Sequence, residues 1–256
     1  MEIETGPALL AGALGGVGLL AGSFLGLVSL RLPRGEDFVA GRSRCRGCDR
    51  PLGPWRLIPL LSYVVSRGQC GACGAAIPGR YPAMELAGAA VGVCAALTQT
   101  SIPAALLTAL LGWQLLLIAV VDGEHFWLPD RLTLPLLGTG LVAAVTLDRL
   151  TPVGSLVGAA VGFGGLWLVG RAYRRVRGRD GLGGGDPFLL AAGGAWTGWI
   201  GLPSVLLWAA LAGLSVVVAR LLTGGRVSGA DRLPFGVFLA LGVWLTWLLG
   251  PLGLSR

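Results

Sequence analysis

The sequence predicts an all-α polytopic membrane protein of about eight transmembrane helices with a small cytosolic zinc-binding loop domain. Hydrophobic residues make up 54% of the 256 positions and charged residues only 13%, with a mean hydropathy of +0.75. That balance excludes an ordinary soluble domain. A helix needs about 20 apolar residues to cross the hydrocarbon core. Runs near this length recur at Pro7–Leu30, Pro82–Thr98, Ile102–Val121, Leu132–Leu147, Val153–Gly170, Pro187–Ile200, Pro203–Leu222 and Pro234–Leu249, the sixth being short and glycine-rich.

The basic residues predict the orientation of these spans. All 20 are arginine, and the connections that contain them alternate along the chain. Basic residues favour the cytoplasmic side of a membrane. One side carries Arg31 to Arg80, Arg131, Arg171 to Arg179, Arg220, Arg226 and Arg232, whereas the other has only Arg149 and Arg256. We therefore expect the amino terminus outside, and we attribute the net charge of +7 to topology rather than to nucleic-acid binding.

Three parts follow from this pattern. Residues 1–30 form the first span, which lacks the basic leading region of a secretory signal peptide and is expected to be retained. Residues 31–80 form a cytosolic loop too small for a hydrophobic core of its own. Residues 81–256 form the transmembrane bundle, which contains the remaining spans together with Asp122 and Asp186.

The loop contains two C-x-x-C pairs, Cys45 with Cys48 and Cys70 with Cys73. Two such pairs at this separation are typical of a tetrahedral four-thiolate zinc site. Disulfides are the alternative, and a reducing cytosol disfavours them. A closed site of this kind offers zinc no open position, so we expect a structural role. Cys94 lies within a span and is expected to be a small buried apolar residue.

Two aspartates lie at the ends of predicted spans. Asp122 closes the third span, and Asp186 opens the sixth after three glycines. The predicted topology puts both carboxylates at the cytosolic face. Carboxylates that share a site cannot both ionise easily, so one holds a proton while the other accepts one from water. That acid and base pair is sufficient to hydrolyse an amide without a metal.

Other interpretations remain open at this point. The two aspartates are equally compatible with helix-end carboxylates facing water, and Asp130, Asp180 and Glu124 are rival partners on the same side. Paired membrane carboxylates also serve proton or cation transport. Transporters usually show internal duplication and mid-membrane carboxylates, and neither is visible here. A non-enzymatic assembly subunit with a zinc loop is a third class.

Ordered motifs along the chain resemble the type IV prepilin peptidases, members of the GxGD aspartic proteases. The likeness covers nearly the whole chain, and it includes both cysteine pairs and Glu85. Its other segments are Gly22 to Leu25, Arg31 to Pro33, Ile58 to Tyr63, Arg67-Gly68, Arg80 to Pro82, Leu128 to Pro135, Gly183 to Asp186, Gly194 to Trp196 with Gly198, and Leu233 to Gly236.

The resemblance implies that Asp122 and Asp186, and not Asp130, are catalytic. It implies a bacterial inner-membrane enzyme that removes the short basic leader of type IV prepilins and secretion pseudopilins at the cytosolic membrane face. A second activity, N-methylation of the new amino terminus with S-adenosylmethionine, is left open, and Glu85 is a candidate contributor to either activity. Two positions depart from the family: Gly26 replaces a frequent Asn, and Phe188 replaces a common Lys.

Overall fold

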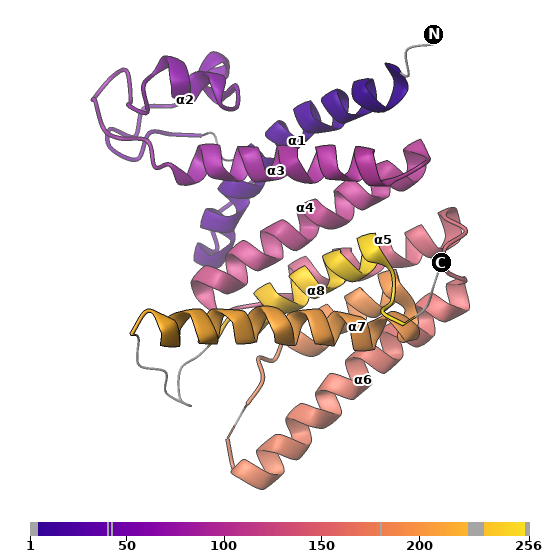
Figure 1. The fold of residues 1–256 in the computed structure, drawn as a ribbon. Coiled ribbons are helices and arrows are strands. Elements are labelled where there is room, and N and C mark those ends of the chain that lie inside the picture. The colour runs from indigo at the N-terminus through magenta and orange to yellow at the C-terminus, as the bar shows by residue number, and fades with distance from the viewer. Residues whose placement is uncertain (1–4, 40, 42, 180, 225–232, 254–256) are drawn as a thin grey trace. The chain divides into compact units, whose positions relative to one another are not determined.

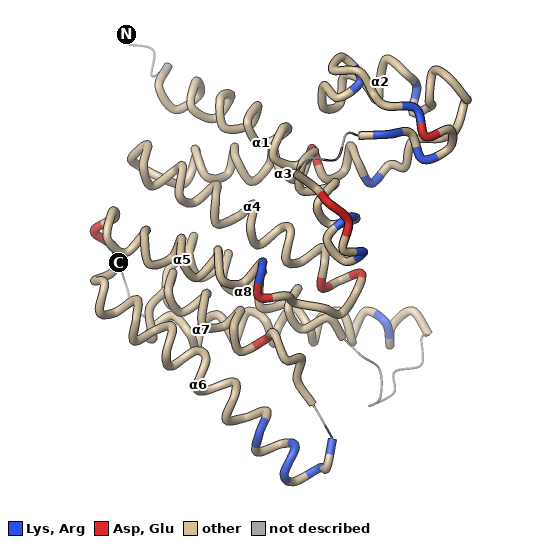
Figure 2. Tube along the Cα trace, turned by 180° about the vertical axis from the view of Figure 1, so that it is seen from behind, with Lys and Arg blue, Asp and Glu red and all other residues tan. Residues whose placement is uncertain are grey.

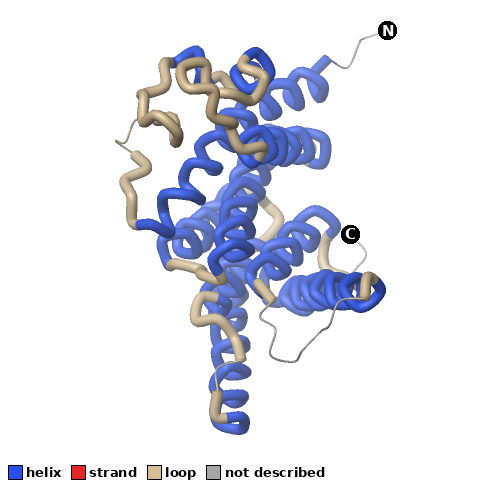
Figure 3. Tube along the Cα trace, turned by 90° about the vertical axis from the view of Figure 1, so that its left-hand side faces the viewer, coloured by secondary structure: helices blue, strands red, loops and turns tan. Residues whose placement is uncertain are grey.

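The computed structural model describes residues 5–39, 41, 43–179, 181–224 and 233–253. Within these ranges the secondary structure is helical, and β pairing is limited to two isolated bridges, Arg44 with Pro51 and Gln69 with Ala76 (Figures 1 and 3). The predicted all-α class is therefore confirmed.

The chain divides into two compact units, one ending at Trp113 and the other beginning at Gln114. Helix α4 (Ile102–His125) runs from the first unit into the second. The first unit also contains α1 (Thr5–Arg31), the 3-10 helices Leu32–Arg34 and Pro54–Leu57, α2 (Leu61–Val65) and α3 (Arg80–Thr98). The second continues with α5 (Asp130–Thr146), α6 (Pro152–Arg177), α7 (Asp186–Leu222) and α8 (Phe235–Leu249).

Five of these helices are long and apolar enough to cross a membrane, namely α1, α3, α4, α6 and α7, and α8 is a shorter apolar helix. The predicted sixth and seventh spans form α7, whose 37 residues would measure about 55 Å if straight. A hydrocarbon core is only about 30 Å thick. Gly198 breaks the helix with φ 70° and ψ 171°, a conformation that side-chain-bearing residues rarely adopt. The break therefore lies close to the predicted boundary between the two spans.

Glycines let the helix backbones approach one another within each unit. In the first unit, a Cβ atom on Gly18 of α1 would overlap the carbonyl oxygen of Gly88 in α3. In the second, a Cβ atom on Gly158 of α6 would overlap the carbonyl oxygen of Gly194 in α7. Lipid surroundings provide no hydrophobic force between helices, so such close packing is a main source of association.

Charged residues gather near the ends of the apolar helices and in the connections between them (Figure 2). Arginines are concentrated in the connection that contains α2 and at the end of α6. Helix α6 continues to Arg177, so the cluster of Arg174, Arg175 and Arg177 forms its last turn rather than part of a loop. Basic side chains in the last turn of a helix interact favourably with the unpaired carbonyl groups at its C-terminal end. Arg226 and Arg232 lie outside the described residues.

We predict that Gly158→Ala lowers the unfolding free energy by about 1–3 kcal/mol, because the added methyl group displaces the α7 backbone. Thermal unfolding of the purified protein in detergent measures this change. Gly164→Ala is the matched control on the same helix, since a Cβ atom there meets nothing within 4 Å. Equal melting temperatures for the two variants would contradict the close packing of α6 on α7.

Candidate active site and metal centre

Asp122 lies in the last turns of α4 and is only 5% exposed. Its Oδ2 atom accepts a hydrogen bond of 3.2 Å from the backbone amide of Val237, in the first turn of α8. The first amides of a helix have no partner within the helix and favour a negative charge. The start of α8 therefore holds a carboxylate contributed by α4.

Asp186 is the first residue of α7 and is 3% exposed. Its Oδ2 atom accepts a 2.9 Å hydrogen bond from the amide of Gly183, and its own amide donates to the Gly183 carbonyl oxygen at 3.2 Å. The chain thus turns tightly just before the helix begins. Pro187 follows as a favourable early residue of the helix.

Leu128 lies between the segments that carry the two aspartates. A Cβ atom on Gly236 would lie 2.7 Å from both Asp122 Oδ2 and Leu128 Cδ1. A Cβ atom on Gly185 would overlap Leu128 in the same way. The structure therefore brings the two predicted residues together around one leucine.

The rival carboxylates are placed differently. Asp130 is the exposed first residue of α5, where it suits the positive end of the helix but is not the cap, which is Pro129. Glu124 is about as exposed as its neighbour His125, whose Nε2 atom is 3.9 Å from the Glu124 carboxylate. Asp180 lies outside the described residues. Burial therefore distinguishes Asp122 and Asp186 from the rivals that are described.

Phe188 has a structural setting that suits it, whereas a Cβ atom at Gly26 would make only an ordinary contact with Met84, so glycine is not required there. The ring of Phe188 packs edge-to-face on Phe163 of α6, with 5.0 Å between ring centroids. An aromatic pair thus occupies the position for which the resemblance suggests a lysine. The Gly26 carbonyl oxygen accepts a 3.0 Å hydrogen bond from the buried hydroxyl of Ser29.

The two cysteine pairs adopt the same turn. The amides of Cys45 and Cys70 donate to the carbonyl oxygens five residues later, of Arg50 and Ala75. The carbonyl oxygens of the same two cysteines accept from the amides four residues later. Those fourth residues, Asp49 and Gly74, have φ values of 53° and 71°, a conformation for which Asp and Gly are well suited.

The two turns bring all four thiols to one point. The Sγ atoms of Cys45, Cys48, Cys70 and Cys73 lie within 4.8 Å of one another. Cys45 Sγ is 3.8 Å from Cys73 Sγ, close to the separation expected of sulfurs about 2.3 Å from a tetrahedral zinc ion. All five cysteines of the chain are unbridged. The cluster is therefore positioned to bind a metal ion.

The thiols of the cluster differ in acidity. Backbone amides of Ala72 and Cys73 stabilise the Cys70 thiolate and lower its pKa to about 6. The Ala75 amide acts in the same direction on Cys73, but the neighbouring thiol of Cys48 and burial outweigh it and raise that pKa to about 11. A bound cation would have to displace the remaining protons, so metal affinity falls as the pH is lowered.

Glu85 connects helices of the first unit to the cysteine-containing segment. It is 7% exposed and lies near the start of α3. Its Oε1 atom accepts from the Ser23 hydroxyl of α1, and its Oε2 atom accepts from the Leu60 amide, each at 2.8 Å. Leu60 has a φ value of 58°, so the carboxylate holds a backbone conformation that leucine rarely adopts.

Some features of these sites have no marker in the sequence. The amides of Val237 and Gly183 hold the aspartates, but a backbone donor can belong to almost any residue. Leu128 and Leu60 occur in the segments that resemble the family, yet nothing in their chemistry predicts the contacts that they make. The glycines beside the carboxylates, Gly185 and Gly236, do indicate that the backbone approaches a neighbouring side chain closely.

The apolar helices define a polytopic membrane protein. Its two buried carboxylates form a site suited to proton exchange, and its four cysteines form a candidate metal centre. Comparison with known proteins makes the class specific. Residues 17–99 match the bacterial peptidase A24 N-terminal domain, and residues 109–218 match the type IV leader peptidase family.

Full-length relatives give the same result. A prepilin leader peptidase/N-methyltransferase of Aeromonas salmonicida is 36% identical over 258 residues, which covers 91% of this chain and 88% of that protein. Its namesake in Pseudomonas aeruginosa is 36% identical over 262 residues, with the same coverage. One from Burkholderia pseudomallei is 38% identical over 219 residues, 86% of this chain and 71% of that protein. The chain therefore belongs to the type IV leader peptidase family. No solved structure matches it significantly.

Removing one thiol should weaken a metal site formed by the four cysteines. We predict that Cys45→Ser lowers the zinc content of the purified protein, because a three-thiolate site is weaker and open to water. Elemental analysis by mass spectrometry measures zinc per chain. Cys94→Ser is the matched control, since Cys94 lies in α3 outside the cluster. Equal zinc content in both variants would contradict a metal site at the four cysteines.

Removing the Glu85 carboxylate should loosen the cysteine-containing segment. Glu85→Ala leaves the Leu60 amide and the Ser23 hydroxyl without their acceptor. Both groups are partly buried, so the cost is at most about 1–3 kcal/mol for each. We expect faster cleavage by trypsin at the arginines of residues 31–80. Glu36→Ala is the control, because Glu36 is exposed and its ion pair with Arg34 is a 4.0 Å surface contact. Unchanged trypsin sensitivity would count against the connection.

Proposed function

We propose that this protein is a membrane aspartic endopeptidase that removes the short basic leader of type IV prepilins and pseudopilins, with Asp122 and Asp186 as its catalytic pair. The observation that carries the proposal is the burial of these two carboxylates around Leu128, each held by one backbone amide. Membership of the leader peptidase family supports the same chemistry.

The pair would act by exchanging protons with water and the peptide. One carboxylate takes a proton from water as the water oxygen bonds to the peptide carbonyl carbon. The other carboxylic acid gives its proton to the peptide nitrogen as the C–N bond breaks, which releases the new amino terminus. Because the first carboxyl group has gained a proton and the second has lost one, the pair ends with one shared proton, as it began.

The arginine distribution supports a cytosolic location for the site. Arginines occur near the start of α5, in the last turn of α6 and near the end of α7. Basic connections favour the cytoplasm, so α4 would run inward and end there with Asp122. The amino terminus would then lie outside. A basic leader preceding an apolar helix would meet the carboxylates at the inner membrane surface.

Zinc is the metal that best fits the four-cysteine cluster, since four thiolates at tetrahedral spacing suit it. Cys45, Cys48, Cys70 and Cys73 would all bind the ion, which leaves no position for substrate. Its contribution would be to the folding of residues 31–80. Release of zinc would therefore reduce cleavage indirectly.

N-methylation of the new amino terminus is a second candidate activity. The relatives from Aeromonas salmonicida and Dichelobacter nodosus carry both activities in their names. S-adenosylmethionine would supply the methyl group. Glu85 is a candidate contributor to this activity.

Cleavage assays test the catalytic pair directly. A prepilin with a carboxy-terminal tag is co-expressed with the enzyme, and loss of its leader is measured by mass spectrometry. We expect Asp122→Asn and Asp186→Asn each to lower cleavage about a hundredfold or more, since each removes one half of the proton exchange. Asp130→Asn is the control and should retain activity, because Asp130 is exposed.

The same experiment separates the two activities. A methyl increment on the cleaved product supports N-methylation, whereas its absence after complete cleavage leaves only the peptidase. Full cleavage by Asp122→Asn or Asp186→Asn would refute the catalytic pair.

A further inference from the structure

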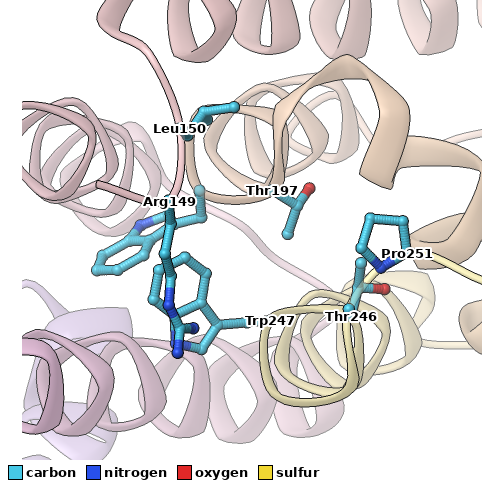
Figure 4. A pocket seen from close by; sticks show the side chains of 8 residues that line it. Arg149, Leu150, Thr197, Thr246, Trp247 and Pro251 are labelled. Atoms are coloured by element: carbon cyan, nitrogen blue, oxygen red, sulfur yellow. The ribbon is translucent and has the colours of Figure 1, made fainter. Parts of the chain in front are cut away.

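Two regions of the chain lie outside the proposed catalytic and metal sites. One is a cavity of about 380 Å³ whose lining includes Arg149, Thr197 and Trp247 (Figure 4). The Arg149 guanidinium group lies 4.9 Å from the centroid of the Trp247 ring, so its charge already interacts within the protein. The other region is an exposed apolar surface on residues 54–65.

This apolar surface combines one face of α2 with the 3-10 helix Pro54–Leu57 that precedes it. Side chains three and four positions apart share a face of a helix, and Val64 and Val65 have this spacing from Leu61. Val64 and Val65 are 70% and 75% exposed, and Trp55 is 82% exposed. Clustered exposed apolar residues usually mark an interaction surface. We call it the α2 surface, and its members are Trp55, Leu57, Leu61, Val64 and Val65.

A hydrogen bond holds the start of α2 at the level of a membrane helix. The Leu60 amide, which immediately precedes α2, donates to Glu85 Oε2 at 2.8 Å. Glu85 is the sixth residue of α3, so it lies about 8 Å along that helix from its start. The 19 residues of α3 measure about 28 Å, which a hydrocarbon core of about 30 Å would cover completely. The start of α2 therefore lies at the depth of about 5–10 Å to which interfacial segments bury their apolar face.

Both ends of residues 31–80 are attached to membrane helices. The segment follows α1, which ends at Arg31, and it leads directly into α3, which begins at Arg80. Arg80 Nη2 donates a 2.7 Å hydrogen bond to the Ser29 hydroxyl of α1, so the two attachment points lie close together. A lipid surface is thus always beside this segment, whereas a protein partner would have to be recruited. The attachment favours lipid as the occupant of the α2 surface.

The charge of the segment is complementary to an anionic membrane. Residues 31–80 contain nine arginines and three acidic residues, which gives a formal net charge of +6. Arg56 and Arg67 are exposed and flank α2 in the sequence, and Figure 2 shows arginines along the same connection. Anionic headgroups attract basic residues next to a membrane helix. Apolar residues with a tryptophan and flanking arginines are typical of segments that lie in the membrane interface.

We propose that the α2 surface inserts into the headgroup region of the membrane that the long helices cross, and that it prefers anionic phospholipids. Trp55 and the two valines contact the upper parts of the acyl chains, while Arg56 and Arg67 interact with phosphate groups. The contact keeps residues 31–80 close to the membrane surface. If the topology proposed above holds, the lipids belong to the cytoplasmic leaflet.

Photocrosslinking identifies what the α2 surface contacts. The purified full-length protein carries the photoreactive amino acid benzoylphenylalanine in place of Trp55, and it is reconstituted in nanodiscs of phosphatidylglycerol. We expect a covalent phospholipid adduct at this position, detected by mass spectrometry. The same replacement of Val39, an exposed residue of the segment outside the α2 surface, is the matched control and should give severalfold less adduct.

Three results would overturn the proposal. A crosslink from position 55 to another protein or to a second copy of this chain would indicate a protein docking surface. The absence of any adduct there would indicate that the surface faces water. Equal lipid adducts at positions 55 and 39 would show that the contact is not selective.

A charged substitution tests the apolar contact itself. Val64→Asp should lower the lipid adduct at position 55 severalfold, because a carboxylate is costly to place among acyl chains. Val39→Asp introduces the same charge outside the α2 surface and should leave the adduct unchanged. Unaltered trypsin cleavage of both variants in detergent would show that residues 31–80 remain folded. Equal adducts in the two variants would contradict insertion of α2.

Changing the lipid tests the preference for negative charge. In nanodiscs of phosphatidylcholine, whose headgroup has no net charge, the adduct at position 55 should fall severalfold. Equal yields in the two lipids would refute the anionic preference. None of these measurements depends on peptidase activity.

Discussion

A polar group inside a membrane needs a partner within the protein, and this requirement shapes the whole chain. Helices satisfy their own backbone groups everywhere except at their ends. The helix starts are therefore where spare amides are available to hold a charged side chain. Asp122 uses an amide at the start of α8, and Asp186 uses the turn that precedes α7. The location of the candidate active site at helix ends follows from the same rule that makes the fold helical.

The long helices and residues 31–80 depend on different interactions for their stability. In each unit, glycines at the helix crossings replace side-chain packing with close backbone approach, as Gly18 with Gly88 and Gly158 with Gly194 illustrate. Residues 31–80 cannot use that solution, because they have no long helix to pack. There the four thiols and the buried Glu85 provide the order. Glu85 connects the helices to residues 31–80, because its carboxylate accepts hydrogen bonds from the Ser23 hydroxyl of α1 and from the Leu60 amide.

Sequence patterns predicted the features that depend on residue identity and spacing. The helical class, the four-cysteine cluster and the proximity of Asp122 to Asp186 all follow from hydropathy, the C-x-x-C pairs and the alternation of arginines. Features that depend on packing could not be predicted. The cavity beside Trp247 needs the end of α5, the break in α7 and the end of α8 to converge. The extension of α6 to Arg177 was missed because arginine is a good helix former but also typical of loops in membrane proteins.

Leu128 packs against two segments of the chain, each of which holds one of the two aspartates. It occupies the room left by Gly185 and by Gly236, so a single side chain from the α4–α5 connection separates the two segments that hold the aspartates. Leu128 therefore packs against both the turn before Asp186 and the start of α8, which holds Asp122. A smaller or larger residue there would shift these two segments, and the carboxylates with them, without removing either acid.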